Sequence, residues 1–183
     1  MTIVVLGDSL ASGHGIDRAA AFPAVLQTKL DGARLPYRIA NQGISGDTTA
    51  GGVRRVARAL DNDARVLVLA LGINDGLRGI PVAQVKANLA AIIRTARARD
   101  IRILLCRMEA LPVYGWDYTF AFRRMFDELA AEYQIALVPF FLESLVGNLA
   151  LMQADRMHPN AAGARVIADR VWPYLRAQLS AST

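Results

Sequence analysis

The chain has 183 residues, enough for one domain with a sizeable core, and 54% of them are hydrophobic, which excludes a disordered protein. The net charge is +5, yet the arginines are scattered without a basic run, so we interpret pairs such as Arg54 and Arg55 mainly as solvated helix faces. Cys106 is the only cysteine, which excludes an internal disulfide, and its apolar neighbours indicate a small buried side chain.

Five apolar runs predict strands, at residues 3–6, 37–40, 66–71, 101–105 and 135–138. Several runs are unbroken rather than alternating, which is typical of parallel strands covered on both faces. Between them lie apolar stripes with helical spacing, one opened by Pro81 and one at residues 122–133. A last helix is expected from Asn160, as its N-cap, toward Leu179, and Pro173 is a possible kink or break in it.

This alternation of strands and helices predicts an α/β fold over residues 1–183 as a single domain. The expected architecture is a three-layer α/β/α sandwich with a five-stranded parallel sheet in the flavodoxin-like order 2-1-3-4-5. In such a sheet ligands bind beyond the carboxyl ends of the strands, at the point where the strand order reverses.

Polar turns follow the first three predicted strands, in the sequences GDS at residues 7–9, NQGISGDT at 41–48 and GIND at 72–75. The strand order would bring these turns together. A serine that attacks an ester carbonyl creates an oxyanion, which needs pre-aimed hydrogen-bond donors. The backbone N–H groups of Ser9 and Gly43 and the side-chain amide of Asn74 are suitable donors. Taken singly, Gly43 and Asn74 are better explained as turn residues.

Ser9 also needs a base, because a hydroxyl is a weak nucleophile at neutral pH. The chain has two histidines. His158 follows Asp155 by three residues, a spacing that lets the carboxylate hold the ring in a turn. His14 lies only five residues after Ser9, and we interpret it as a partly exposed residue at the cleft rim. Asp8 is expected to brace its own turn, and Asp47 to cap a helix.

Together, GDSL at residues 7–10, Gly43 within NQGISGDTT, GIND at 72–75 and DRMHPN at 155–160 resemble the GDSL or SGNH hydrolases. The likeness covers nearly the whole chain and is greatest to small bacterial esterases of the acyl-CoA thioesterase, lysophospholipase and arylesterase type. Two blocks depart from the common pattern. GIND stands where close relatives often have GGND, and DRMHPN where many have DGIHPN, which puts rate and substrate shape in doubt.

The resemblance implies a serine esterase that forms an acyl-enzyme on Ser9, with His158 as base, Asp155 as orienting acid and an oxyanion hole of Ser9, Gly43 and Asn74. It implies no cofactor and no metal. The expected substrates are small molecules: short to medium acyl esters, acyl-thioesters or lysophospholipids. Two loops after strand ends, 75–81 and 111–116, are expected to line the acyl site through Leu77, Ile80, Pro112, Tyr114 and Trp116.

Other functions remain open at this point. The same triad could serve an acyltransferase or a carbohydrate deacetylase. A flavodoxin-like nucleotide-binding module would explain GDSLASGHG alone, but the chain lacks the Gly-Lys-Ser/Thr of a P-loop. A non-catalytic interaction domain would leave the catalytic positions unused. We expect no nucleic-acid partner and no stable membrane insertion. Without a signal peptide the expected compartment is cytoplasmic, or periplasmic or secreted if one has been removed.

Overall fold

The five apolar runs form one parallel sheet in the computed structural model, which describes residues 1–60 and 63–180. The sheet order is β2-β1-β3-β4-β5, with all four pairings parallel, as predicted. The strands are β1 Thr2–Gly7, β2 Arg38–Gly43, β3 Ala64–Ala70, β4 Arg102–Cys106 and β5 Ala136–Val138. Each lies within three residues of its predicted bounds, and β2 departs most because it continues through polar residues to Gly43.

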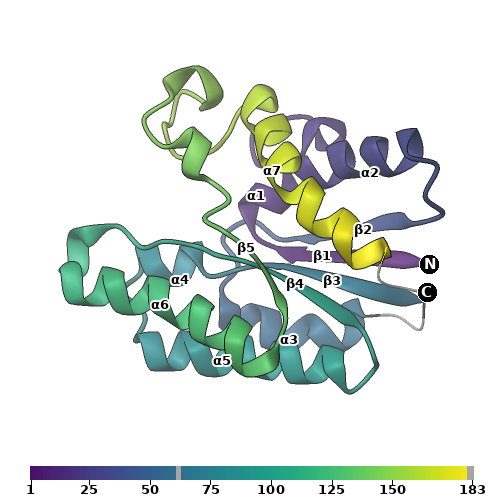
Figure 1. The fold of residues 1–183 in the computed structure, drawn as a ribbon. Helices are drawn as coiled ribbons and strands as arrows, with labels where there is room; N and C mark the ends of the chain where they lie inside the picture. The colour runs from purple at the N-terminus through teal and green to yellow at the C-terminus, as the bar shows by residue number, and fades with distance from the viewer. Residues whose placement is uncertain (61–62, 181–183) are drawn as a thin grey trace.

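Helices cover both faces of the sheet and complete the three-layer sandwich (Figure 1). One face carries α1 (Ser9–Ser12), α2 (Phe22–Gly32) and α7 (Ala161–Ser180), and the other carries α3 (Thr49–Ala59), α5 (Val82–Arg97) and α6 (Trp116–Tyr133). Shorter elements connect them: α4 Ile73–Leu77 and the 3₁₀ turns Arg18–Ala20, Pro112–Tyr114, Glu143–Leu145 and Leu149–Leu151.

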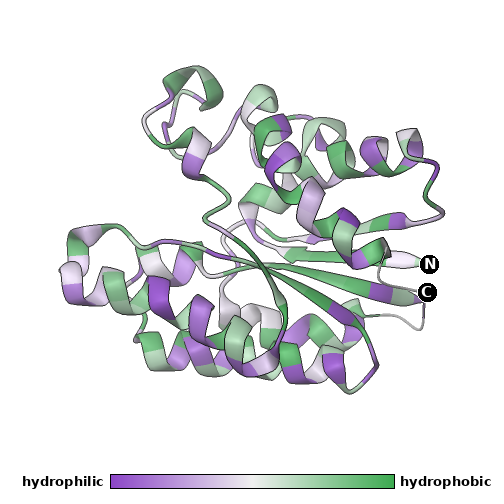
Figure 2. Cartoon of the chain, in the orientation of Figure 1, coloured by the Kyte–Doolittle hydropathy of each residue, from purple (hydrophilic) through white to green (hydrophobic). Residues whose placement is uncertain are grey.

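The core lies between the layers, where the central strands are hydrophobic along their length (Figure 2). Cys106 is fully buried there, and burial raises the pKa of its thiol to about 12, so it is a small apolar residue, as predicted. The two apolar helical stripes also face this core, because Val85 and Leu89 of α5 and Phe122 and Phe126 of α6 are buried.

Two residues, Asn160 and Asp47, were predicted to cap helices, and the structure confirms the first and not the second. Asn160 caps α7, since its Oδ1 accepts the N–H groups of Ala162 and Gly163 at 2.9 and 3.0 Å. That helix runs on past Pro173, so the possible break does not occur. The prediction for Asp47 was wrong, because Thr48 is the N-cap of α3. The Asp47 carboxylate binds the side chain of Arg55 instead.

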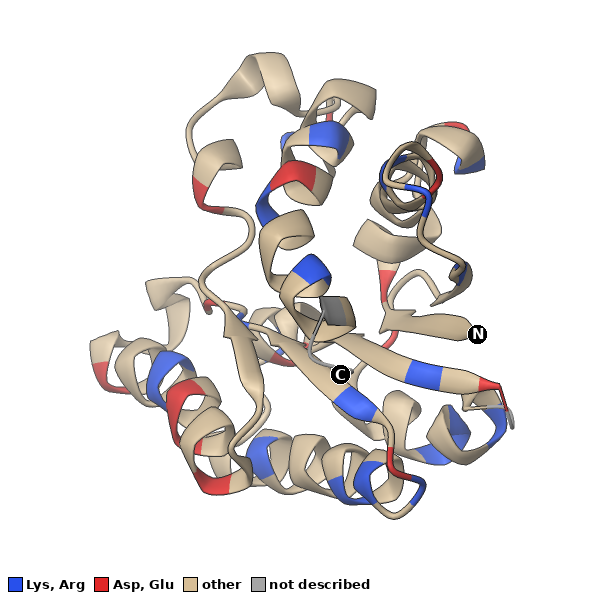
Figure 3. Cartoon of the chain, turned by 45° about the vertical axis from the view of Figure 1, so that its right-hand side comes forward, with Lys and Arg blue, Asp and Glu red and all other residues tan. Residues whose placement is uncertain are grey.

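Charged residues of both signs are interspersed over the outer helices rather than gathered by sign (Figure 3). Lys86 of α5, for example, pairs with Glu128 of α6 at 2.7 Å. Such exposed pairs are typical of solvated helix faces and contribute little stability each. Within the two described ranges, no helix is both long enough and apolar enough to cross a membrane.

Candidate active site

Ser9 lies at the carboxyl end of β1, near the middle of the sheet, as the first residue of α1. Asp8 caps this short helix: its Oδ1 accepts the N–H of Leu10 at 3.0 Å, so the residue braces its own turn. The turn places Ser9 in the wall of a cleft that Asn74 and His158 also line.

The structure brings Ser9, His158 and Asp155 together from opposite ends of the chain. His158 Nε2 lies 3.2 Å from Ser9 Oγ, and His158 Nδ1 lies 2.7 Å from Asp155 Oδ2. A carboxylate only accepts hydrogen bonds, so Nδ1 carries the proton and Nε2 is left to accept one from Ser9. This is the geometry of a nucleophile, a base and an orienting group.

Asp155 is held as a carboxylate by its own turn. Its Oδ1 accepts the backbone N–H groups of Met157 and His158 at 2.9 and 3.0 Å. The His158 N–H, the His158 ring and the Met157 N–H hold the pKa of the Asp155 carboxyl well below its usual range. The charge that orients the imidazole is therefore fixed at neutral pH.

Arg156, between these residues, has a φ of 55°. This left-handed conformation costs a side-chain-bearing residue about 1–2 kcal/mol but is open to glycine, the residue found at this point in the more common DGIHPN pattern. We expect Arg156→Gly to raise the free energy of unfolding by about 0.5–1 kcal/mol, after subtraction of the backbone entropy that glycine loses on folding. Denaturant unfolding of the wild type and the variant measures this difference in the free energy of unfolding. A variant less stable than the wild type would contradict the prediction.

His14 packs against the ring of His158. The two rings are 4.5 Å apart between centroids, and His14 Nδ1 is 3.3 Å from Ser45 Oγ. The Gln153 side chain ties the two loops together, because its Nε2 donates to the carbonyl oxygens of His14 and Pro159. His14 therefore packs on the ring that contacts Ser9, rather than reaching Ser9 itself.

Asn74 lies at the start of α4 and lines the cleft beside Ser9. Its Nδ2 donates one hydrogen to the carbonyl oxygen of Asp47 at 2.9 Å, which fixes the amide plane. The second hydrogen of the same nitrogen has no acceptor among the described residues and is available to a ligand. Asn74 thus fits the predicted donor role.

Gly43 does not fit the donor role predicted for it. Its single N–H already donates to Asn41 Oδ1 at 2.9 Å. A Cβ on Gly43 would lie 2.3 Å from the backbone nitrogen of Ser12 and 2.6 Å from the carbonyl carbon of Ala11. Glycine is needed here because α1 packs directly on this backbone, which is a packing requirement.

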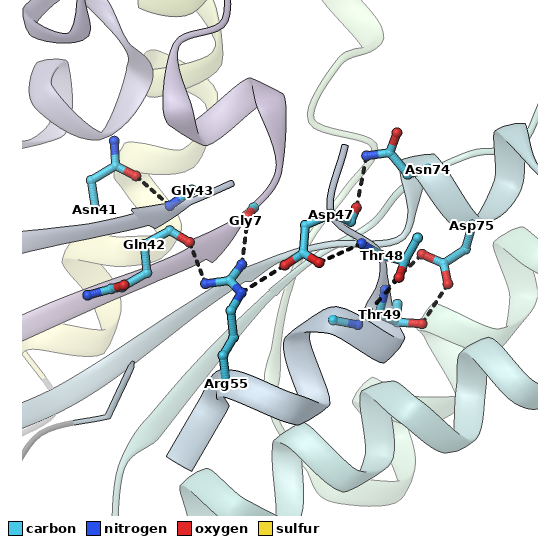
Figure 4. A network of polar contacts seen from close by, with 11 residues as sticks. Gly7, Asn41, Gln42, Gly43, Asp47, Thr48, Thr49, Arg55, Asn74 and Asp75 are labelled. Carbon is cyan, nitrogen blue, oxygen red and sulfur yellow. Dashed lines mark hydrogen bonds and ion pairs between the residues drawn. The ribbon is translucent and has the colours of Figure 1, made fainter. Parts of the chain in front are cut away.

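Gly46, three residues later, has the free backbone N–H that Gly43 lacks, and the sequence reasoning did not single it out. Its φ of 76° turns the chain, and its N–H has no acceptor among the described residues. The next residue is Asp47, whose carbonyl oxygen accepts the side-chain amide of Asn74 (Figure 4). The second glycine of NQGISGDTT was the available signal.

The cleft around Ser9 has a volume of about 510 Å³ and mostly apolar walls. Three of the five predicted substrate-binding residues line it: Leu77, Pro112 and Trp116. The other two predictions are not supported, because Tyr114 donates its hydroxyl hydrogen to the Leu77 carbonyl and Ile80 packs against the core. The sequence reasoning missed one whole wall, formed by Phe140, Leu142, Leu145, Val146, Leu149 and Met152.

No group of three or more His, Cys, Asp or Glu side chains in residues 1–60 and 63–180 is arranged to hold a metal ion. The polar groups that face the cleft are those of the serine, histidine and asparagine described above, with Glu109, Thr119, Asn148 and Arg156 at its walls.

Comparison with known proteins assigns a family to this arrangement. The model of the GDSL-like lipase/acylhydrolase family matches residues 5–166. Esterase TesA of Pseudomonas aeruginosa is 42% identical over 96% of this chain and 88% of its own length. Thioesterase 1/protease 1/lysophospholipase L1 of Escherichia coli is 35% identical over 92% and 80%. A crystal structure of TesA superposes with a TM-score of 0.92 at 40% identity, covering 97% of this chain and 99% of that one.

The family model spans most of the chain, and these relatives align along nearly its whole length. The four sequence blocks, the sheet order and the cleft at the ends of β1 and β3 are accounted for together, which a nucleotide-binding module would not explain. The chain belongs to the GDSL-like lipase/acylhydrolase family and is a carboxylic ester hydrolase.

Proposed function

We propose that the chain hydrolyses esters and thioesters through an acyl-enzyme on Ser9, with His158 as general base and acid and Asp155 as its orienting group. The observation that carries this proposal is the contact chain of 3.2 Å from Ser9 Oγ to His158 Nε2 and 2.7 Å from His158 Nδ1 to Asp155. Each group has the partner that its role requires.

The reaction has two steps. In the first, Ser9 Oγ attacks the acyl carbon while His158 Nε2 takes the hydroxyl proton; the bond to the leaving group breaks, and the imidazolium returns the proton to that group. In the second, water loses a proton to Nε2 and attacks the acyl-enzyme, which releases the acid and restores the Ser9 hydroxyl. Asp155 stabilises the imidazolium in both steps and keeps its own charge.

The oxyanion formed in each step needs donors on the side of Ser9 away from His158. We propose the N–H of Ser9, the second amide hydrogen of Asn74 and the N–H of Gly46, which replaces Gly43 in this role. We favour Gly46 over Gly43 as a donor because the N–H of Gly46 is free within the described structure, whereas the N–H of Gly43 already donates to Asn41. Donors that are already aimed need no reorganisation when charge develops, and this is the usual source of their large effect.

The substrates that fit best are acyl esters or thioesters with short to medium acyl chains, including lysophospholipids. The apolar walls of the 510 Å³ cleft support an acyl chain rather than a sugar as the group bound there. The names of two relatives, thioesterase 1/protease 1/lysophospholipase L1 and esterase TesA, point to the same classes. Transfer of the acyl group to an alcohol would use the same triad.

The test is covalent trapping with a p-nitrophenyl alkylphosphonate, followed by peptide mass spectrometry and a crystal structure of the adduct. We expect one phosphonyl group per chain, on Ser9, and parallel loss of activity on p-nitrophenyl acetate, butyrate, octanoate and palmitate. Ser9→Ala should take up no label and lack activity. Label on another residue, or an active Ser9→Ala, would refute the proposal. In the adduct, a phosphonyl oxygen within hydrogen-bond distance of Gly43 rather than Gly46 would refute the exchange of donors.

A further inference from the structure

Arg55 is a partly buried charge that the reaction described above does not use. The sequence suggests a pair of solvated arginines on α3, but only Arg54 is exposed, whereas the side chain of Arg55 is 18% exposed. An ion in such a place needs both a counter-charge and full use of its hydrogen-bond donors to offset its desolvation. The partners of Arg55 show where that charge acts.

The Arg55 guanidinium joins the carboxyl ends of β1 and β2 to the turn that follows β2 (Figure 4). Its Nη2 donates to the carbonyl oxygen of Gly7 at 2.9 Å, its Nη1 to that of Gln42 at 2.6 Å, and its Nε to Asp47 Oδ2 at 2.8 Å. Gly7 ends β1 two residues before Ser9, and Gln42 is the second-last residue of β2. The guanidinium spreads its five N–H groups over three nitrogens in one plane, so it can reach three separate acceptors, whereas a lysine donates from a single nitrogen.

Asp47 connects Arg55 to Asn74 through hydrogen bonds. Its carboxylate is held at both oxygens, by Arg55 and by the N–H of Thr48 at 3.0 Å. Its carbonyl oxygen then accepts the amide of Asn74. Gly51 makes room for the carboxylate, because a Cβ there would lie 1.7 Å from Asp47 Oδ1. The position of the Asn74 amide relative to Ser9 thus depends on the Arg55–Asp47 pair.

A second contact fixes α4 to α3 without Arg55. The buried carboxylate of Asp75 accepts the N–H of Thr49 at 2.9 Å and its hydroxyl at 2.7 Å, and Asn88 donates to the same hydroxyl. This contact anchors the backbone of α4, so loss of Arg55 should leave the fold in place. What Arg55 adds is the relative position of the turns that carry Ser9, Gly46 and Asn74.

We propose that Arg55 is a positioning residue for the oxyanion hole, acting through the carbonyl of Gly7 and through Asp47 to set Ser9, Gly46 and Asn74 at fixed distances. The inference rests on the proposed function of Ser9. Donors displaced by a fraction of an ångström still admit the substrate but stabilise the oxyanion less. The effect of removing Arg55 should therefore fall on kcat rather than on KM.

The experiment compares Arg55→Met and Arg55→Lys with wild type, using p-nitrophenyl butyrate well below each Tm. We expect kcat to fall about 10- to 100-fold in Arg55→Met, less than for outright loss of an oxyanion donor, with KM changed less than about 3-fold. Arg55→Lys should recover part of the loss, since lysine can keep the pair with Asp47. The rate of Ser9 phosphonylation should fall in parallel with kcat, because that reaction uses the same hole.

Two matched variants separate positioning from general damage. Arg107 is 15% exposed and ion-paired to Asp127 at 3.1 Å, so Arg107→Met removes an arginine of similar burial from another part of the fold. Arg54→Met removes the exposed neighbour on the same helix. We expect both to keep kcat within about 2-fold. The proposal is overturned if Arg55→Met and Arg55→Lys keep wild-type kcat, or if Arg107→Met loses kcat to the same extent at equal loss of Tm.

Asp47→Asn tests the same contact from the other side. Because Arg55 is inferred to act partly through Asp47, the double variant Asp47→Asn/Arg55→Met should lose less kcat than the product of the single losses. Strict multiplicativity would contradict that route. Ser9→Ala, run in the same assay, keeps the two proposals apart: an active Ser9→Ala refutes the proposed function, whereas an inert one with fully active Arg55 variants refutes only the positioning role.

Discussion

Asp155→Asn should lower kcat by about 10³- to 10⁴-fold while the protein stays folded, and the reason lies in the turn rather than in the charge alone. Asp155 Oδ1 accepts two backbone N–H groups, of Met157 and His158. In an asparagine only the carbonyl oxygen can accept them, so its NH₂ group must take the place of Oδ2 and face the imidazole.

That orientation of the amide favours the opposite tautomer of the His158 imidazole. An NH₂ group at the position of Oδ2 needs an acceptor at His158 Nδ1, which moves the ring proton to Nε2. Nε2 then points an N–H at Ser9 Oγ, 3.2 Å away, and cannot take its proton. The variant would still bind substrate, but His158 could not act as a general base, so kcat should fall with little change in KM.

Steady-state kinetics on p-nitrophenyl butyrate, with Tm measured in parallel, gives the result. Asp169→Asn is the control, because Asp169 is an exposed carboxylate on α7, paired with Lys29 and with no second ionic partner in residues 1–60 and 63–180. We expect it to keep full activity. If Asp155→Asn retained more than about a tenth of wild-type kcat, Asp155 would not orient the base in the way its contacts indicate.

The fold was predictable from local patterns because this sheet is covered on both faces. Unbroken apolar runs marked β1, β3 and β4, whose side chains are almost all buried. β2 is an edge strand, and its end at Asn41–Gly43 is set by pairing with β1 rather than by hydrophobicity, so the apolar run ended too early. Likewise no apolar pattern distinguishes Arg55, which contacts the ends of β1 and β2 and the turn after β2, from Arg54, which is exposed.

The sequence predicted which residues come together in the candidate site where side-chain chemistry marks them. It did not predict the features that depend on the direction of the backbone. Ser9, His158 and Asp155 stand out as residue types in turns after strands or before a helix. Gly43 and Gly46 are identical as residues, and only the folded chain shows that the N–H of Gly43 is bound by the Asn41 side chain while that of Gly46 is free among the described residues. The cleft wall formed by residues between 140 and 152 was not predicted, because its apolar residues lie in irregular turns and show no periodic spacing.

Asp8 should make the protein less stable as the pH rises from acid toward neutral, by about 4 kcal/mol over the whole range. Its side chain is fully buried beside Ser9, and its Oδ2 has no hydrogen-bond partner in the described structure. Burial, aided by the nearby carboxylates of Asp47 and Asp75 and opposed by the bond from Leu10, raises the pKa of this carboxyl from 3.8 to about 7.

The direction follows from where the proton is held. The native state keeps it up to about pH 7, whereas the unfolded chain releases it near pH 3.8. The stabilisation is therefore complete below pH 3.8 and is lost at about 1.4 kcal/mol per pH unit until the native carboxyl ionises near pH 7. Asp155 acts in the opposite sense and in another window, because its lowered pKa stabilises the native state above the usual carboxyl pKa.

Asp8→Asn isolates the effect, because the amide oxygen can still accept the Leu10 N–H and the side chain stays neutral at every pH. We expect the free energy of unfolding of the variant, relative to wild type, to rise by about 3 kcal/mol between pH 5 and pH 8. Urea unfolding at four pH values in that range measures it, and every other titration is common to both proteins. A constant difference between the two proteins would mean that Asp8 is ionised in the native state throughout, with its charge compensated by neighbours of Ser9.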